Sequence, residues 1–278
     1  MNETAEAVSE RVRISVVDHV AEVALSRPDK HNGLDYAMFM ALSAAIDEVA
    51  ATPAVRAVVL YGEGPSFCAG LDFAAFISEQ RPVDALFVRR DGEDANLAQR
   101  VAYGWQALPM PVIAALQGNC IGGGAQIALG ADIRIGSLDT RISIREVAYG
   151  LIPDMGATAS LPRLVTADVA KELVWTGRFV SAEEALRIGL LTKVEEEPLE
   201  AARELAKTIA SHSPDAIRHG KQLIEACYGP DPAVSLPLEE RLQRELMQAP
   251  NQIAAVTATM IRQPAEFIDP PPTGVASG

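Results

Sequence analysis

Two carboxylates, Glu146 and Asp154, lie on either side of a short apolar segment, 147–152, which is interrupted by Gly150 and followed by Pro153. A carboxylate beside apolar surface is desolvated, and desolvation raises its pKa toward the range of a useful acid or base. Such a pair could move protons. Two surface carboxylates beside a turn give the same pattern and are the more common case, because most carboxylates have ordinary pKa values.

A glycine-rich stretch, residues 118–132, reads GNCIGGGAQIALGAD. It follows an apolar segment at 111–116 that suits a buried strand, and residues 125–129 suit the first turns of a buried helix. The three glycines at 122–124 join the two, and backbone N–H groups there can stabilise a developing oxyanion. Tight packing of helix on sheet also needs small residues, so both interpretations stay open. Gln126 is either a polar site residue or an exposed helix residue.

Several other kinds of site are not indicated. The four histidines do not have the spacing of metal ligands, and the chain contains neither a G-x-S-x-G elbow nor a P-loop. The three cysteines, Cys68, Cys120 and Cys227, are widely spaced and odd in number, which favours a reducing compartment over a disulfide framework. We therefore expect a site without a metal or a redox cofactor.

Composition narrows the class of protein. The chain has 278 residues, 49% of them hydrophobic, and a formal net charge of −13. This acidic balance argues against a nucleic-acid partner. Residues 1–10 lack the pattern of a signal peptide, and no apolar run is long enough to span a membrane. We expect a cytoplasmic protein with neither a nucleic-acid nor a membrane partner.

Strand and helix patterns alternate through the first half of the chain, which predicts α/β packing with parallel strands. The expected elements are a β-hairpin at 12–26, a helix at 36–51, a strand at 57–60, a second glycine-rich loop at 62–72, a partly helical region at 77–107, and strands at 111–116 and 131–136.

The second half has the pattern of a helical region. Ser181 to Glu184 form a predicted capping box, and Ser213 followed by Pro214 is a typical helix start. The expected helices are 181–189, 199–209, 213–228, 239–247 and 251–261, followed by a disordered tail that includes 269–278.

Four stretches taken together resemble the crotonase superfamily, also called the enoyl-CoA hydratase/isomerase family. They are 27–34 (RPDKHNGL), 67–72 (FCAGLD), 118–132 and 146–156, and the similarity covers roughly 12–261. The same order and spacing of all four is far more specific than any one of them. The resemblance implies an α/β fold built as a ββα spiral, with C-terminal helices that mediate trimerisation, and a homotrimer or homohexamer.

With this fold we expect four regions in the chain. They are a flexible N-terminus at 1–11, the spiral core at 12–196, a C-terminal helical region at 197–263 and a disordered tail at 264–278.

The resemblance also implies roles for single residues. The N–H groups of Leu71 and Gly123 would hold the thioester C=O of an acyl-CoA as it becomes an enolate, because the free carbanion is too high in energy. Coenzyme A is here part of the substrate, and no separate cofactor is expected. Its adenine, pantetheine and phosphates would be held by two loops, with the residues Arg27, Lys30, His31, Cys68, Ala69 and Gly70.

One departure from the family pattern concerns the reaction. Hydratases of the family use two glutamates to activate water, and these positions carry Glu146 and Gln126 here. An amide cannot act as a base near neutral pH. Asp154 matches an aspartate of the Δ3,5-Δ2,4-dienoyl-CoA isomerases, although those enzymes have a third acid at the position of Gln126. Simple Δ3-Δ2-enoyl-CoA isomerases manage with the one glutamate.

We therefore expect an enzyme that shifts a double bond in an enoyl- or dienoyl-CoA. Glu146 would remove the proton, Asp154 would return it, and Gln126 would hydrogen-bond substrate or water. The first alternative is a hydratase, a type of lyase, with an altered water site. A non-catalytic acyl-CoA-binding scaffold is the second.

Overall fold

The computed structural model describes residues 7–8, 10–78, 83–212, 214–226, 237, 240, 243–244 and 247–263. The strands are β1 (Ala7–Val8), β2 (Val12–Val17), β3 (Val20–Leu25), β4 (Ala57–Gly62), β5 (Val112–Leu116), β6 (Asn119–Ile121), β7 (Ile133–Gly136), β8 (Arg141–Ser143), β9 (Val180–Ser181) and β10 (Lys193–Val194). The α-helices are α1 (Tyr36–Ala51), α2 (Phe73–Ser78), α3 (Leu97–Ala107), α4 (Gly123–Leu129), α5 (Ala157–Leu164), α6 (Ala167–Thr176), α7 (Ala182–Ile188), α8 (Pro198–Ala210), α9 (Pro214–Ala226) and α11 (Pro250–Ile261). Three short 3-10 helices are η1 (Pro28–Lys30), η2 (Val83–Phe87) and η3 (Glu146–Tyr149).

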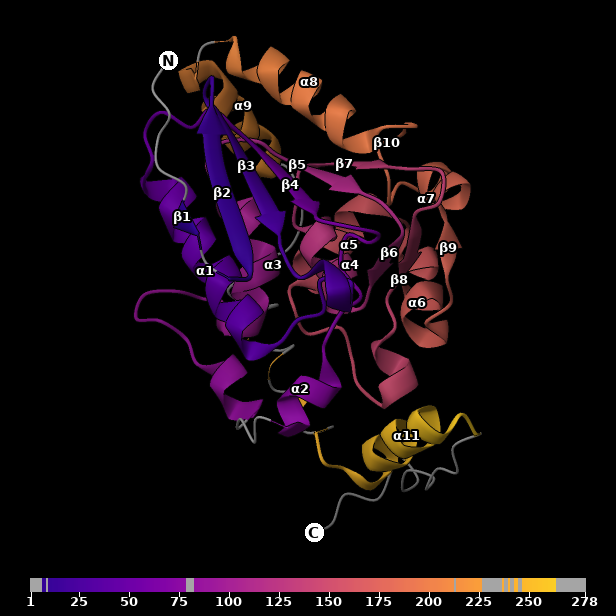
Figure 1. Ribbon diagram of the computed structural model, residues 1–278. Helices are drawn as coiled ribbons and strands as arrows, with labels where there is room; N and C mark the ends of the chain where they lie inside the picture. The colour runs from indigo at the N-terminus through magenta and orange to yellow at the C-terminus, as the bar shows by residue number, and fades with distance from the viewer. Residues whose placement is uncertain are drawn as a thin grey trace.

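Two sheets form the frame of the molecule (Figure 1). The larger has the order β1-β2-β3-β4-β5-β7-β10, with β1, β2 and β3 antiparallel and the pairs from β3 to β10 parallel. The smaller has the order β6-β8-β9. The hairpin and the parallel strands predicted from the sequence are therefore confirmed.

Each turn of the chain contributes one strand to each sheet. β5 is followed by β6 and then α4, and β7 is followed by β8 and then η3 and α5. An isolated bridge between Cys68 and Cys120 extends the smaller sheet toward the preceding turn. This repeated strand–strand–helix order confirms the expected spiral. The expectation that the glycines at 122–124 join β5 directly to a helix was wrong, because β6, too short to show a pattern, lies between them.

The central strands β4 and β5 of the larger sheet are buried on both faces, which explains their continuous apolar sequences. Alternate residues of β4 point to opposite sides, so Val58 packs in one hydrophobic core and Val59 in the other. The first core lies between the sheet and α1, α3 and α4. In the second core, α8 lays a stripe of small residues, Ala202, Ala206 and Ala210, on the sheet.

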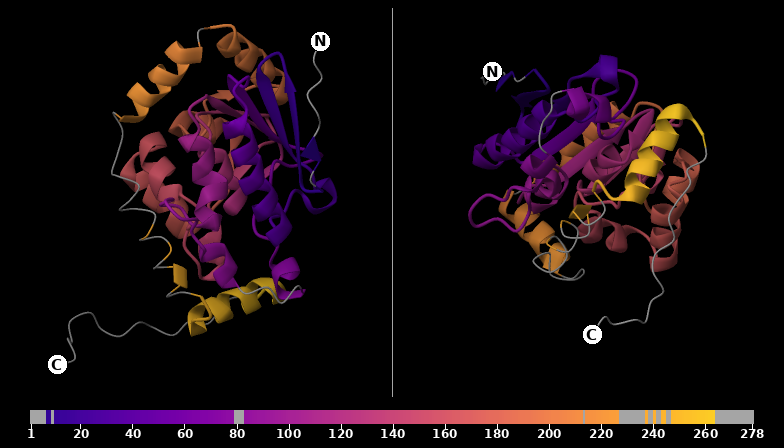
Figure 2. Two further views of the ribbon diagram at one scale, coloured as in Figure 1. Left: turned by 90° about the vertical axis from the view of Figure 1, so that its left-hand side faces the viewer. Right: turned by 90° about the horizontal axis from the view of Figure 1, so that it is seen from below.

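The C-terminal helices lie at opposite ends of the molecule. α8 and α9 cover the upper end of the larger sheet, whereas α11 lies at the lower end (Figures 1 and 2). There Thr259 of α11 donates a hydrogen bond to the carbonyl of Ala148 in η3, at 3.0 Å. Trimerisation through these helices and the region boundary at 196/197 stay predictions. No helix in the described part of the chain has the length and apolar character needed to cross a membrane.

The helices differ from the expected ones in a few places. α5 and α6 were not expected. The capping box at Ser181 is half formed: Ser181 Oγ accepts from the Glu184 N–H, while the Glu184 carboxylate pairs with Arg178. Ser213, most of 239–247 and the predicted tail lie outside the described residues.

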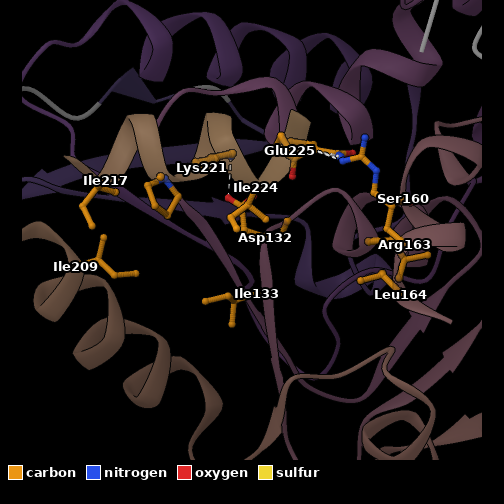
Figure 3. A pocket seen from close by; sticks show the side chains of 15 residues that line it. Asp132, Ile133, Ser160, Arg163, Leu164, Ile209, Ile217, Lys221, Ile224 and Glu225 are labelled. Carbon is orange, nitrogen blue, oxygen red and sulfur yellow. Dashed lines mark hydrogen bonds and ion pairs between the residues drawn. The ribbon is translucent and has the colours of Figure 1, made fainter. Parts of the chain in front are cut away.

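An ion pair between Lys221 and Asp132 ties α9 to the starts of β5 and β7 (Figure 3). Lys221 Nζ lies 2.8 Å from Asp132 Oδ2 and also donates to the carbonyl of Met110. The same Asp132 oxygen accepts from the Val112 N–H at 2.7 Å. Burial raises the pKa of Asp132, and the charge of Lys221 opposes that shift. The pair borders a cavity of about 560 Å³ between α5, α8, α9 and the sheet.

Replacing Lys221 by methionine should lower the free energy of unfolding by about 3 kcal/mol, because it leaves a buried carboxylate without its partner. The loss should shrink as the pH falls and Asp132 takes up a proton. Urea denaturation at pH 8 and pH 5 measures both effects. Lys207→Met is the matched control, because its ion pair with Glu204 is exposed, and it should leave the urea midpoint unchanged. Equal midpoints for the two variants would contradict this account of α9.

Candidate active site

A cavity of about 510 Å³ opens where α2, η2, η3 and α11 meet, and its wall is mainly apolar. Such a volume suits a small-molecule ligand. Among the described residues that line it, the charged side chains are Arg145, Glu146 and Asp154. Leu71 and Gly123 line the same cavity. The structure thus brings both predicted carboxylates and both predicted N–H donors to one hollow.

Two glycines let the loops that carry the N–H groups touch. Gly70 has φ of 88° and Gly122 has φ of 54°, values that side chains disfavour. A Cβ on Gly70 would lie 2.7 Å from the carbonyl oxygen of Ile121 and 3.6 Å from the nitrogen of Gly123. The loops after β4 and after β6 therefore meet only because residue 70 is glycine.

The N–H groups of Leu71 and Gly123 have no hydrogen-bond acceptor among the described residues. Leu34 pairs with the residues on either side of Leu71, since its N–H donates to Gly70 O and its carbonyl accepts from Asp72 N. The Leu71 N–H points away from that pairing, and Gly123 is the first residue of α4, whose N–H groups have no partner within the helix. Two such donors at one cavity can hold an oxyanion.

The carboxylate of Glu146 lies over the glycine turn at the start of α4. A Cβ on Gly122 would be 3.5 Å from Glu146 Oε1, and Gln126 Nε2 donates to that oxygen at 2.7 Å. Glu146 Oε2 is buried and has no hydrogen-bond partner among the described residues. Burial raises the pKa of Glu146 to about 7, although hydrogen bonds from its own backbone and from Gln126 oppose the shift. A carboxylate with this pKa suits a general base near neutral pH.

Asp154 reaches the cavity from the loop that precedes α5. The next residue, Met155, is buried and donates its backbone N–H to Gln126 Oε1 at 2.8 Å. The start of this loop is fixed from the other side, because the Ile152 N–H donates to Gln243 Oε1 at 3.3 Å. Asp154 therefore projects from a backbone that is held on both sides.

Gln126 lies in a different place from the one expected. Its side chain is 1% exposed, so the interpretation as an exposed helix residue was wrong. The described residues that line the cavity do not include it, and both ends of its amide are bonded to protein atoms. The structure thus places Gln126 behind Glu146, and the expectation that it hydrogen-bonds substrate is corrected.

Of the expected pantetheine loop, Ala69 and Gly70 line the cavity and Cys68 does not. Cys68 is fully buried, and its backbone pairs with β6, since its N–H donates to Asn119 O and its carbonyl accepts from Ile121 N. Burial raises the pKa of its thiol to about 12. Cys68 therefore holds the loop in place, while its two successors face the hollow.

The charge of Arg27 is paired with a carboxylate inside the protein, which corrects the expectation that it binds a phosphate of coenzyme A. Its Nη1 lies 2.8 Å from Asp72 Oδ2 and 2.9 Å from the carbonyl of Gly33, and its side chain is 13% exposed. Lys30 and His31 are exposed in the same loop, with His31 Nδ1 2.9 Å from Ser66 Oγ. Lys30 is thus the cation of this loop that faces solvent.

Aromatic residues in the cavity wall were missed in the sequence. Phe73 and Tyr149 stack with ring centroids 4.6 Å apart, and Phe39 meets Phe76 edge to face at 6.2 Å. They come from α1, α2 and η3, so no local pattern marks them as one group. Among the described residues, no group of three or more His, Cys, Asp or Glu side chains could hold a metal ion.

Comparisons with known proteins agree with this geometry. The sequence model of the enoyl-CoA hydratase/isomerase family matches residues 16–267. A short-chain-enoyl-CoA hydratase of Clostridium acetobutylicum is 36% identical over 250 residues, which covers 89% of this chain and 93% of that protein. A mitochondrial Δ3,5-Δ2,4-dienoyl-CoA isomerase of Mus musculus is 31% identical over 271 residues, covering 91% and 80%.

Solved structures show the same fold. An enoyl-CoA hydratase/isomerase from Pseudoalteromonas atlantica T6c superposes with a TM-score of 0.82 at 25% identity, covering 93% of this chain and all of that one. An enoyl-CoA hydratase from Mycobacterium avium subsp. paratuberculosis K-10 gives a TM-score of 0.80 at 26% identity, covering 93% and 99%. The chain belongs to the enoyl-CoA hydratase/isomerase family, the crotonase superfamily.

Proposed function

We propose that this enzyme moves a double bond in an enoyl- or dienoyl-CoA thioester through an enolate. One observation carries the proposal: Glu146 and Asp154 line the same cavity as the N–H groups of Leu71 and Gly123. An acyl-CoA seated there would have its thioester oxygen at the donors and its acyl carbons between two carboxyl groups.

The reaction would use each group once. The thioester oxygen accepts hydrogen bonds from Leu71 and Gly123, which stabilise negative charge as it develops. Glu146 takes a proton from the carbon next to the thioester, and the electron pair shifts along the chain. A proton carried by Asp154 is added at the far carbon, so the double bond moves and no atom of water enters the product.

Coenzyme A would be held at the loops that border the cavity. Ala69 and Gly70 offer backbone groups to the pantetheine arm, and the exposed Lys30 offers a positive charge to the phosphates. On a chain with a net charge of −13, such a local cation matters for an anionic ligand. A homotrimer or homohexamer in the cytoplasm remains the expected setting.

Isomerisation fits this site better than two other functions do. The C. acetobutylicum relative is named a hydratase, and hydration by the two-glutamate mechanism would need a second carboxylate where this chain has Gln126. A non-catalytic acyl-CoA-binding scaffold would not need the buried base, Glu146, whose pKa is raised to about 7. The pairing of Glu146 with Asp154 in one cavity favours proton transfer over both.

Glu146 should set the acidic side of the pH profile. Because the base must be ionised and its pKa is about 7, kcat/KM should fall as the pH drops below 7, approaching about a tenfold loss for each further unit. Steady-state kinetics with an enoyl-CoA measures this. Glu146→Gln should abolish turnover while keeping or raising the melting temperature at pH 8, because it removes a buried charge. A folded Glu146→Gln enzyme with normal rates would exclude this base.

Asp154→Asn should separate the two proton transfers. The amide has the same shape but cannot supply the proton for the far carbon. Isomerisation should therefore fall by about a hundredfold or more, while exchange of the proton next to the thioester with solvent deuterium continues. Mass spectrometry of acyl-CoA incubated in deuterium oxide gives both rates. If exchange and isomerisation fall together, Asp154 is not the acid at the far carbon.

A further inference from the structure

Gln126 connects the two catalytic segments of the site. Its Nε2 donates to Glu146 Oε1 at 2.7 Å, and its Oε1 accepts from the Met155 backbone at 2.8 Å. Glu146 comes 20 residues later in the chain and Met155 comes 29 residues later. One buried amide on α4 therefore ties η3 to the loop that carries Asp154.

The amide acts on the cavity without entering it. Gln126 is 1% exposed and lies outside the described residues that line the hollow. Any influence on the reaction must therefore pass through Glu146 or through the backbone next to Asp154.

Holding one carboxylate oxygen has two physical consequences. With Oε1 engaged, Oε2 is the oxygen that has no protein partner among the described residues, so it is the one left to accept a proton. A hydrogen bond to a carboxylate also favours its ionised form, which opposes the effect of burial on the pKa of Glu146. Glu146 is thereby held in one orientation and can ionise near neutral pH.

We propose that Gln126 is a positioning residue that aims Glu146 Oε2 at the substrate carbon and fixes the backbone of the Asp154 loop through Met155. This inference rests on the proposed proton transfer between Glu146 and Asp154. It replaces the expected contact between Gln126 and substrate or water.

An amide can make both bonds, and a carboxylate cannot. Glutamate at residue 126 would still accept from the Met155 N–H. It would also bring a second carboxylate to within hydrogen-bond distance of Glu146, and two such groups must share a proton, which raises the higher pKa of the pair. Gln126→Glu thus breaks one half of the connection, whereas Gln126→Leu breaks both.

The two variants test the two halves separately. In both, the acidic limb of the kcat/KM profile should move to higher pH by about one unit, because Gln126→Leu removes the donor to Glu146 and Gln126→Glu puts a second carboxylate beside it. KM should stay within about twofold and kcat should fall about tenfold or more, since the cavity wall is intact but the base is misaligned. Hydrogen–deuterium exchange at the Met155 amide should accelerate in Gln126→Leu and stay slow in Gln126→Glu.

Gln106→Leu is the matched control. Gln106 also donates to a carboxylate, Glu225 Oε2 at 3.0 Å, but it lies away from the cavity that holds Glu146. Gln106→Leu should leave the acidic limb of the kcat/KM profile and the exchange rate of the Met155 amide at their wild-type values.

Two results distinguish a failure of the proposed function from a failure of the positioning role. A wild-type enzyme that turns over no enoyl-CoA would contradict the proposed function. An active enzyme whose acidic limb is unchanged in both Gln126 variants would contradict the positioning role alone. If Gln126→Leu does not fold, the acidic limb of the kcat/KM profile of the isosteric Gln126→Glu still tests the positioning role.

Discussion

The carboxylate of Glu146 is buried in an apolar wall with one hydrogen bond from a side chain, that of Gln126, and the site depends on keeping it there. Burial makes the carboxylate a stronger base, because its ionised form loses solvation. The same burial would leave the group protonated and unaimed if nothing opposed it. The backbone of Glu146 and the amide of Gln126 supply that opposition, and Oε2, which has no hydrogen-bond partner among the described residues, is what remains for chemistry.

The two-sheet spiral explains how distant segments reach this carboxylate. Each turn of the chain places a long strand in the larger sheet and a short strand or bridge in the smaller one. The loops after successive turns therefore stack at one edge, where Gly70 lies against the start of α4 and η3 lies over the turn at Gly122. α11 lies at the lower end of the molecule (Figure 2), where Thr259 donates to the carbonyl of Ala148, and Gln252 and Val256 of α11 line the hollow. The groups proposed to act on the substrate come from loops and from the first residues of η3 and α4, while the buried parallel strands keep these segments in register.

Much of this could be predicted from the sequence, for local reasons. The helix expected at 36–51 has those bounds in α1, since its apolar residues have helical spacing and Asp35 caps it. Glu146 and Asp154 were singled out because an apolar segment separates them, and their roles came from the resemblance to the family. The roles of Gln126 and Arg27 could not be predicted, because the partners of Gln126 are 20 and 29 residues away and the Asp72 partner of Arg27 is 45 residues away, so only tertiary packing brings them together. A polar residue on a short helix has the same sequence pattern whether it faces solvent or the back of a buried carboxylate.

The central claim is that the site moves protons and does not add water, and isotope incorporation by the wild-type enzyme tests it most directly. A panel of 2-enoyl-, 3-enoyl- and 3,5-dienoyl-CoA thioesters would be incubated in deuterium oxide and in ¹⁸O-water, with products followed by mass spectrometry. The account predicts deuterium in the isomerised product and no ¹⁸O, because Glu146 and Asp154 exchange protons with solvent while the carbon skeleton gains no oxygen. Rapid formation of an ¹⁸O-labelled 3-hydroxyacyl-CoA would contradict it and would make the enzyme a hydratase that works with an amide at residue 126.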